Sequence, residues 1–295
     1  MSLFIDADTR VLVQGITGNE GRFWTAHMAA MGTRVCAGVT PGKEGQTVEG
    51  VPVYHTVRRA AAEHPCDAAM LFVPPRAVKD AVFEALDSGI RKLVTVADGI
   101  PVRDALEIRR AALDCGALVI GGNTSGAISP GKGMMGMFPY WIKRVYTPGT
   151  IGIMTRSGSL TNEITSMVVK AGFGVSTLIG VGGDTVPGTR FAELLPLYEA
   201  DPETEALVVI GELGGTMEEE LAEALQQGVC TKPVTAFVGG RTAPEGKRMG
   251  HAGAIASSGK GSVQSKVAAL EAAGVRAADR PSTVGIYLQE LLKTE

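Results

Sequence analysis

The sequence predicts an α/β protein in which a Rossmann-like domain precedes a flavodoxin-like, doubly wound domain. Short apolar runs alternate with helical patterns of about ten to fifteen residues, as expected for parallel strands covered on both faces. The 295 residues suffice for two domains that each bury a core. Glycine, at 39 residues, clusters at the ends of the apolar runs, where backbone can approach a ligand closely.

The first domain is predicted over residues 1–128 and a linker over 129–149. Helices are expected between the strands, at 20–31, 56–64, 76–88 and 101–114. The predicted strands are RVLVQG, TRVCAGV, AAMLFVP, KLVTVAD and ALVIGG. The linker, SPGKGMMGMFPYWIKRVYTPG, is rich in glycine and proline and shows no clear period. We expect the apolar part of this linker, Met134 to Trp141, to be exposed and covered by a partner, with ordinary core packing of a Met-rich stretch as the alternative.

The second domain is predicted over residues 150–295. Helices are expected at 160–171, 189–199, 216–227 and 281–293. The predicted strands are TIGIMTRSG, STLIGVGG, ALVVIGELGG, PVTAFVGG and a last strand around GVRAAD. Open α/β sheets bind ligands outside the carboxyl ends of their strands, so each domain offers a site.

Composition excludes several classes of function. A net charge of −3 with mixed signs and only 5% aromatic residues argue against a nucleic-acid partner. The four cysteines lack zinc or disulfide spacing, so we expect no metal site. No apolar run is long enough to cross a bilayer, and the first residues lack the pattern of a signal peptide. We therefore expect a cytoplasmic protein without a membrane partner.

The first strand ends in a glycine-rich turn suited to phosphate. Gly15, Gly18 and Gly21 lie between a strand and a helix, where backbone amides can meet an anion. An NAD site requires an acid about 20 residues further on, but the second strand ends in TPGK with Lys43. Coenzyme A, which carries an additional ribose phosphate, fits this chemistry better than NAD. An ordinary turn with a solvated lysine stays open for Lys43 taken alone.

The histidine of GHAGA is the candidate nucleophile. Small neighbours surround His251, and an imidazole with open space can accept and pass on a bulky group. Glu212 ends a buried strand, where a carboxylate is costly without a partner and could orient the imidazole. The amides of residues 157–160, at the start of a helix, form an anion site. A histidine in a glycine loop without a task is the structural alternative.

These residues lie within longer motifs: QGITGNEG, GVTPGK, TVADGIP, GGNTSG, TRSGSLTNE, GVGGD, PGTRF, DPETEALVVIGELGG and GKRMGHAGAI. Over practically its whole length the chain resembles the α subunit of succinyl-CoA synthetase and related acyl-CoA synthetases, which are acid-thiol ligases. The resemblance implies that His251 is phosphorylated and that Glu212 orients it. It implies a CoA site at Thr17, Gly18, Asn19, Glu20, Lys43, Pro74, Val96, Ala97 and Asp98. It implies a phosphate and acid site at Asn123, Thr124, Ser125, Ser157, Gly158, Ser159 and Asn162.

Two departures from the family pattern leave the acid open. The family's NCPG reads NTSG here, so Thr124 and Ser125 replace Cys and Pro. Asn162 stands where the family usually has tyrosine, and the sequence there looks like that of ATP-citrate lyase. Succinate is the default acid, and malate or citrate are the alternatives.

The resemblance also implies a partner. The chain contains no GxxxxGK[ST] motif, so ATP or GTP with Mg²⁺ is expected to bind mainly to an ATP-grasp β subunit in a heterodimer or heterotetramer. The expected reaction joins a di- or tricarboxylic acid to CoA through a phosphohistidine and an acyl phosphate. An NAD-dependent oxidoreductase and a non-catalytic CoA-binding regulatory protein are the competing classes.

Overall fold

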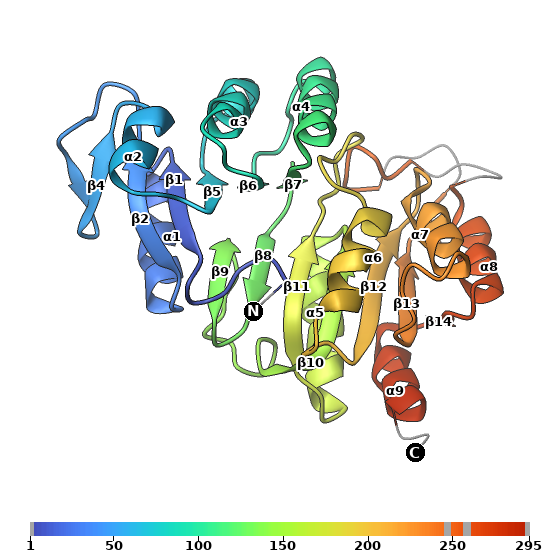
Figure 1. The fold of residues 1–295 in the computed structure, drawn as a ribbon. Coiled ribbons are helices and arrows are strands. Elements are labelled where there is room, and N and C mark those ends of the chain that lie inside the picture. The colour runs from blue at the N-terminus through green and yellow to red at the C-terminus, as the bar shows by residue number, and fades with distance from the viewer. Residues whose placement is uncertain (1–2, 245–248, 256–260, 293–295) are drawn as a thin grey trace. The chain divides into compact units, whose positions relative to one another are not determined.

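The computed structural model shows an α/β chain whose strands are mainly parallel, as the sequence predicts (Figure 1). It describes residues 3–244, 249–255 and 261–292. The N-terminal unit consists of Phe4–Phe138 together with Val186–Thr189, and the C-terminal unit consists mainly of Pro139–Thr185 and Arg190–Glu295. Residues 186–189, which lie within the range predicted for the second domain, thus belong to the N-terminal unit.

The N-terminal unit is built on one sheet in the strand order β3-β4-β2-β1-β5-β6-β7. All its pairs are parallel except β3 with β4. The strands are β1 (Arg10–Gln14), β2 (Arg34–Val39), β3 (Thr47–Val48), β4 (Val51–Tyr54), β5 (Ala68–Leu71), β6 (Lys92–Thr95) and β7 (Leu118–Gly121). Because the crossover direction reverses between β1 and β5, a crevice opens at the carboxyl ends of these strands.

Helices cover both faces of this sheet (Figure 1). The helices are α1 (Asn19–Ala30), α2 (Val57–Glu63), the short 3₁₀ helix η1 (Pro75–Ala77), α3 (Val78–Asp87) and α4 (Val102–Cys115). Helices α2, α3 and α4 contact one another in a row over one apolar face, whereas α1 contacts β1 and β2. Right-handed crossovers place α1 on the opposite face from this row.

A hairpin follows β7 and packs on α1. Its strands are β8 (Gly126–Ser129) and β9 (Gly133–Gly136), which pair antiparallel. The Thr33 hydroxyl donates to the Met134 carbonyl at 2.8 Å. Met134, Met135 and Phe138 are buried, so the expectation that they await a partner is wrong, because this chain already covers them. Trp141 is 51% exposed.

In the C-terminal unit five parallel strands follow the order β14-β13-β12-β10-β11. The strands are β10 (Pro148–Thr155), β11 (Val175–Gly180), β12 (Ala206–Glu212), β13 (Val234–Gly239) and β14 (Arg276–Ala278). The helices are α5 (Gly158–Lys170), α6 (Phe191–Ala200), α7 (Met217–Gln226), α8 (Val263–Ala272) and α9 (Pro281–Leu292). Helices α6, α7 and α8 contact in a row on one face, and α5 pairs with α9 on the other (Figure 1). This is the flavodoxin-like order that the sequence predicts.

The register of the C-terminal sheet brings the ends of three strands to one edge. Thr155 of β10 is opposite Ile210 of β12, and Glu212 is opposite Gly239 of β13. The crossover direction reverses between β10 and β12, so the crevice of this sheet opens beside Glu212.

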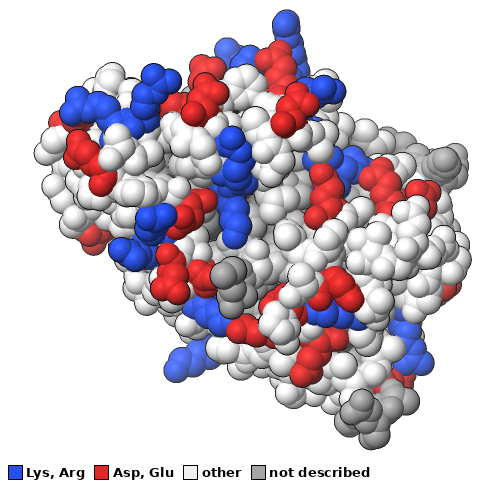
Figure 2. Space-filling view, viewed as in Figure 1, with Lys and Arg blue, Asp and Glu red and all other residues white. Residues whose placement is uncertain are grey.

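The surface adds little to this picture. On the face that Figure 2 shows, Lys and Arg side chains are interspersed with Asp and Glu, and neither sign forms a continuous patch. Among the described helices, none combines the length and the apolar character that crossing a membrane requires.

Candidate functional site

The candidate nucleophile is hydrogen bonded to the carboxylate that ends β12. His251 Nδ1 lies 2.7 Å from Glu212 Oε2, and the side chains are 24% and 9% exposed. This contact raises the pKa of His251 above its ordinary value, and it outweighs burial, which acts in the opposite direction. When Nδ1 carries the proton toward Glu212, Nε2 is the nitrogen with the nucleophilic lone pair. The roles of both residues remain predictions.

The imidazole is packed more closely than the small neighbours of His251 suggest. A Cβ added to Gly183, in the loop after β11, would lie 2.3 Å from Cγ and Nδ1 of His251. The Gly253 amide donates to the Gly183 carbonyl at 3.1 Å, which fixes the GHAGA loop against this glycine. The expected open space around the ring is therefore only partial, because a distant segment of the chain covers one side of it.

A buried arginine contacts the far side of Glu212. Arg156, directly after β10, is 4% exposed. Its Nη2 lies 3.2 Å from Glu212 Oε1, and its Nη1 donates to the Gly214 carbonyl at 2.8 Å. Glu212 is thus held between a guanidinium on one oxygen and an imidazole on the other. Arg156 was not predicted from the sequence, although a charged residue directly after a buried strand, as in TRSG, is a signal that could have found it.

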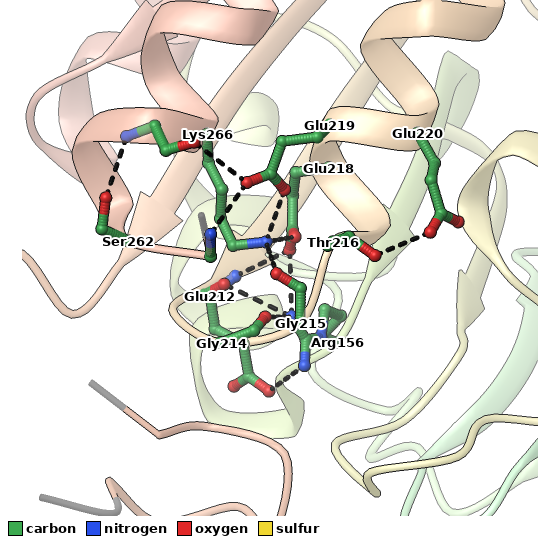
Figure 3. A network of polar contacts seen from close by, with 12 residues as sticks. Arg156, Glu212, Gly214, Gly215, Thr216, Glu218, Glu219, Glu220, Ser262 and Lys266 are labelled. Carbon is green, nitrogen blue, oxygen red and sulfur yellow. Dashed lines mark hydrogen bonds and ion pairs between the residues drawn. The ribbon is translucent and has the colours of Figure 1, made fainter. Parts of the chain in front are cut away.

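More charged side chains are buried behind Arg156. Glu218, at the start of α7, is fully buried and lies 3.3 Å from Arg156 Nη1 through Oε1. Figure 3 shows the Lys266 ammonium of α8 between Glu218 and Glu219, and its distance to Glu219 Oε2 is 2.9 Å. Burial alone would raise the pKa of Glu218, but Arg156 and Lys266 outweigh it and the pKa is lowered.

His251 lines a pocket of about 280 Å³ at the carboxyl edge of the C-terminal sheet. The start of α5 contributes Ser157, Ser159 and Leu160 to the lining. Ser157 is the N-cap of α5 and accepts a hydrogen bond from the Leu160 amide. A helix N-terminus presents amide donors and partial positive charge, so phosphate or carboxylate is favoured next to His251. Ser157 and Ser159, which the sequence analysis names as phosphate-binding residues, thus line the pocket of His251, and Gly158 starts the same helix. Their role in binding stays a prediction.

Asn162 is not among the residues that line this pocket. It is exposed on the second turn of α5, and its side-chain oxygen accepts a hydrogen bond from the Tyr146 hydroxyl. The structure therefore ties Asn162 to Tyr146 within the C-terminal unit. Its role in binding the acid remains a prediction.

The N-terminal unit has a larger pocket, of about 660 Å³, at the carboxyl ends of β1, β2 and β5. Thr17, Gly18 and Pro74 are among the predicted residues that line it. Gly15 adopts φ of +79°, and a Cβ there would meet the Phe72 carbonyl at 2.2 Å. A Cβ on Gly21 would likewise meet the Gly15 carbonyl at 2.2 Å, so the glycine spacing lets the turn fold against α1.

The other predicted CoA residues lie outside this lining. Asn19 and Glu20 begin α1 and are exposed, as is Lys43 in the turn after β2. The remaining three, which follow β6, are Val96, Ala97 and Asp98. Their contribution to a CoA site remains a prediction.

The NTSG segment follows β7. Asn123 adopts φ of +52°, its amide donates to the Ala97 carbonyl at 2.8 Å, and its side chain donates to Asp98 at 3.1 Å. The Thr124 hydroxyl accepts from the Gly126 amide at 3.0 Å, and the Ser125 carbonyl accepts from the Met137 amide at 2.8 Å. These bonds hold the three predicted residues in one ordered turn of the N-terminal unit.

Within the described ranges, no group of three or more His, Cys, Asp or Glu residues could hold a metal ion. The carboxylates of the network around Arg156 are paired with Arg156 and Lys266, which is a reason for carboxylates to gather there without a metal.

The family matches divide the chain in the same way as the two units of the fold. Residues 6–99 match the family described as CoA binding domain, and residues 154–276 match the family described as CoA-ligase. The chain is 67% identical over 292 residues to the ADP-forming sulfoacetate-CoA ligase subunit SauD of Bilophila wadsworthia, covering 99% of this chain and 100% of that protein. It is 47% identical over 279 residues to the ADP-forming succinate–CoA ligase subunit alpha 1 of Archaeoglobus fulgidus, covering 95% and 94%.

A solved structure shares both the fold and part of the sequence. The ATP citrate lyase of Methanosaeta concilii, in complex with (3S)-citryl-CoA, superposes with a TM-score of 0.89 at 26% identity. The match covers 98% of this chain and 50% of that one, so this chain spans about half the length of the lyase.

Proposed function

Because the chain belongs to the family of ADP-forming CoA-ligase α subunits, we propose that His251 carries phosphate from ATP to an acid that becomes a CoA thioester. The observation that carries this proposal is the 2.7 Å contact of His251 Nδ1 with Glu212, beside a helix N-terminus that favours anions. A nucleophile, its orienting acid and an anion cradle are the parts that phosphoryl transfer through histidine needs.

The reaction proceeds in three displacements. The Nε2 lone pair of His251 attacks the γ-phosphorus of ATP, and the bond to the bridging oxygen breaks so that ADP leaves. A carboxylate oxygen of the acid then takes the phosphoryl group from Nε2 and forms an acyl phosphate. Finally the CoA sulfur attacks the acyl carbon, phosphate leaves with the C–O electron pair, and the thiol proton passes to phosphate or solvent. The second step turns a carboxylate oxygen, which cannot leave, into phosphate, which the CoA sulfur can displace from the acyl carbon.

Glu212 supports the first two displacements through charge. The imidazole ring becomes positive while Nε2 is phosphorylated, and the carboxylate on Nδ1 stabilises that charge. The α5 amides near Ser157 stabilise the transferring phosphoryl oxygens.

CoA binds in the pocket of the N-terminal unit. The glycine turn at Gly18 and the first turn of α1 receive the diphosphate, and the apolar lining at Phe72 and Pro74 receives the base. Lys43 supplies positive charge to the ribose phosphate.

We propose sulfoacetate as the acid, in place of the succinate that the resemblance set as default. The relative named as a sulfoacetate-CoA ligase subunit is much more similar to this chain than the one named for succinate. Sulfoacetate carries a sulfonate one methylene from its carboxylate, and three sulfonate oxygens need more hydrogen-bond donors than a carboxylate does. Thr124 and Ser125 place hydroxyl donors where the family has Cys and Pro, which supports this choice.

The partner is a β subunit that binds ATP and Mg²⁺. The relatives are named as subunits of ligases, and this sequence has no P-loop of its own. We propose the ATP-grasp fold for that subunit, as the resemblance implies.

The test is turnover of the coexpressed pair with CoA and ATP on sulfoacetate, succinate, malate and citrate. We expect sulfoacetate to give the highest kcat/KM and ADP to appear in equal amount to the thioester. Higher kcat/KM with succinate would overturn the choice of acid but not the ligase.

A phosphorylation test addresses the mechanism. With γ-labelled ATP the wild-type pair should gain a phosphate that is stable in base and labile in acid, and the His251→Ala pair should gain none. Label retained by His251→Ala would exclude the phosphohistidine. Binding of CoA without turnover of any of the four substrates and without phosphorylation of the protein would favour the non-catalytic CoA-binding regulatory protein.

A further inference from the structure

Arg156 makes more contacts with the Glu212 segment than an ion pair requires. Beyond Nη2 on Glu212 Oε1, its Nη1 lies 3.3 Å from the Glu212 carbonyl and 2.8 Å from the Gly214 carbonyl. One planar guanidinium therefore contacts both the backbone and the side chain of Glu212, the residue that is hydrogen bonded to His251. Nη1 of this fork makes hydrogen bonds to the two carbonyls, whereas Nη2 faces Glu212 Oε1 as an ion pair without hydrogen-bond geometry. The planar guanidinium is thus fixed by the backbone and holds its charge at the carboxylate, which the single nitrogen of a lysine cannot do at once.

Arg156 is itself held by a buried ion pair. Glu218 uses Oε1 to accept from Arg156 and from the Glu212 amide, at 3.3 Å and 3.1 Å, while Oε2 contacts Lys266. Glu218 and Lys266 are both fully buried, so neither charge is screened by water. Lys266 also donates to the Gly215 carbonyl at 3.0 Å. Figure 3 shows these side chains converging from α7, α8 and the end of β10.

The backbone is built around this arrangement. A Cβ on Gly211 would lie 2.6 Å from Glu218 Oε1, so only glycine lets β12 lie against that carboxylate. Burying four charges is expensive unless each is paired, and a purely structural core would be as stable with apolar residues. The free-energy cost of burying these charges is explained if the network contributes to the function of the site at Glu212 and His251.

We propose that Arg156, held in place by Glu218 and Lys266, is a positioning residue that fixes the Glu212 carboxylate and thereby the tautomer and direction of the His251 ring. The proposal rests on the proposed function of His251 as phosphoryl carrier. None of the three is among the residues that line the pocket beside His251, and they act through Glu212.

The charges of the cluster predict opposite effects of two substitutions. Arg156 and Lys266 are cations, and Glu212, Glu218 and Glu219 are carboxylates. The loop after β11 also places Asp184 near His251, and the start of α5 contributes no charged side chain to the pocket. Removing a cation favours the imidazolium, and removing a carboxylate disfavours it.

The experiment compares four variants of the full chain with its partner subunit: Arg156→Gln, Arg156→Lys, Glu218→Gln and, as matched control, Arg190→Gln. Arg190 forms a two-pronged ion pair with Glu220 in the same unit, at 2.6 and 2.7 Å, outside the site. The readouts are the pH dependence of His251 phosphorylation and the ¹⁵N spectrum of the His251 ring in the unphosphorylated full chain, assigned with His251→Ala.

Neutral imidazole is the attacking form, so the rate rises with pH through the pKa of His251. Arg156→Gln should move this rise to higher pH and Glu218→Gln to lower pH, each by about half a unit or more. Arg156→Lys keeps the charge but loses the fork, so the rise should stay near that of wild type while kcat falls at least about tenfold. Arg190→Gln should change neither quantity.

The ring spectrum gives a readout that does not require turnover. Wild type should show the Nδ1–H tautomer, and the two Arg156 variants should show a mixture with Nε2–H. If Arg156→Gln fails to fold, Arg156→Lys and Glu218→Gln decide the question. A wild-type tautomer in the Arg156 variants, together with a wild-type pH profile in Glu218→Gln, would overturn the proposal even where His251 is phosphorylated. Absence of label on wild type would instead overturn the proposed function.

Discussion

At the scale of single residues, the pairing of His251 with Glu212 couples stability to pH. The hydrogen bond to Glu212 raises the pKa of His251 above its unfolded value of about 6.5, so the folded chain binds the proton more tightly. The stabilisation is complete below pH 6.5 and is lost as pH rises through the raised pKa. Urea unfolding from pH 5.5 to 8.5 should therefore show wild type losing stability relative to His251→Asn as pH increases. If the stability of wild type relative to His251→Asn stayed constant or increased with pH, the hydrogen bond between His251 and Glu212 would be contradicted.

Gly183 is a second residue whose substitution is informative. Its added methyl would lie 2.3 Å from Cγ and Nδ1 of His251 and 2.8 Å from its Cβ, so the GHAGA backbone as well as the ring must shift. Gly183→Ala should therefore abolish phosphorylation of His251 and lower the free energy of unfolding by about 1–3 kcal/mol, as overpacking does. Labelling and urea unfolding of the same sample check both statements. Normal labelling would mean that the ring does not need its position against Gly183.

At the scale of elements, the start of α5 connects helix stability with anion binding. Ser157 is the N-cap, and its hydroxyl accepts from the Leu160 amide, whereas Ser159 lies inside the helix. Ser157→Ala should lower the stability of the chain by about 1 kcal/mol and weaken phosphate binding. For the capping effect alone, Ser159→Ala is the control, because Ser159 is not the N-cap, and it should cost less than about 0.5 kcal/mol of stability. Thermal unfolding with and without phosphate measures the loss of stability and the loss of phosphate binding. Equal losses of stability in Ser157→Ala and Ser159→Ala would exclude the capping role of Ser157.

At the scale of the whole molecule, each unit carries its own pocket. The described residues that line the pocket proposed for CoA all lie between Gln14 and Glu84, so the full chain should bind CoA without a partner and His251→Ala should bind it equally well. Lys43→Ala should weaken CoA about fivefold but leave 3′-dephospho-CoA unchanged, because the exposed lysine contributes only through the ribose phosphate. Calorimetry on the full chain checks this. An equal loss of affinity for CoA and for 3′-dephospho-CoA would show that Lys43 does not act through the ribose phosphate.

The alternation of apolar runs with helical patterns was enough to predict both parallel sheets, because strands buried on both faces cannot tolerate polar residues. The contact between Glu212 and His251 could be anticipated for a related reason, since a carboxylate at the end of the apolar run ALVVIGE needs a partner. The hairpin of β8 and β9 was not predicted, because its glycine-rich strands carry little periodic signal.

Arg156, Gly183, Glu218 and Lys266 escaped prediction for a different reason. They come from four separate segments, and each alone is compatible with a solvated charge or an ordinary turn. Only close packing at the edge of the C-terminal sheet gives them a common role, as the contacts of Arg156 with both Glu212 and Glu218 illustrate.

By itself, the sequence determined the α/β class, the glycine-rich turn after the first strand, and the carboxylate of Glu212 at the end of a buried strand. Those properties follow from local periodicity and from the cost of burying charge, which are written in neighbouring residues. The tertiary structure alone decided which side of His251 is covered, which oxygen of Glu212 holds it, and which buried cations hold Glu212. Such choices depend on distances between segments far apart in sequence, and a hydrogen bond or a 2.3 Å overlap exists only once the sheet has brought those segments together.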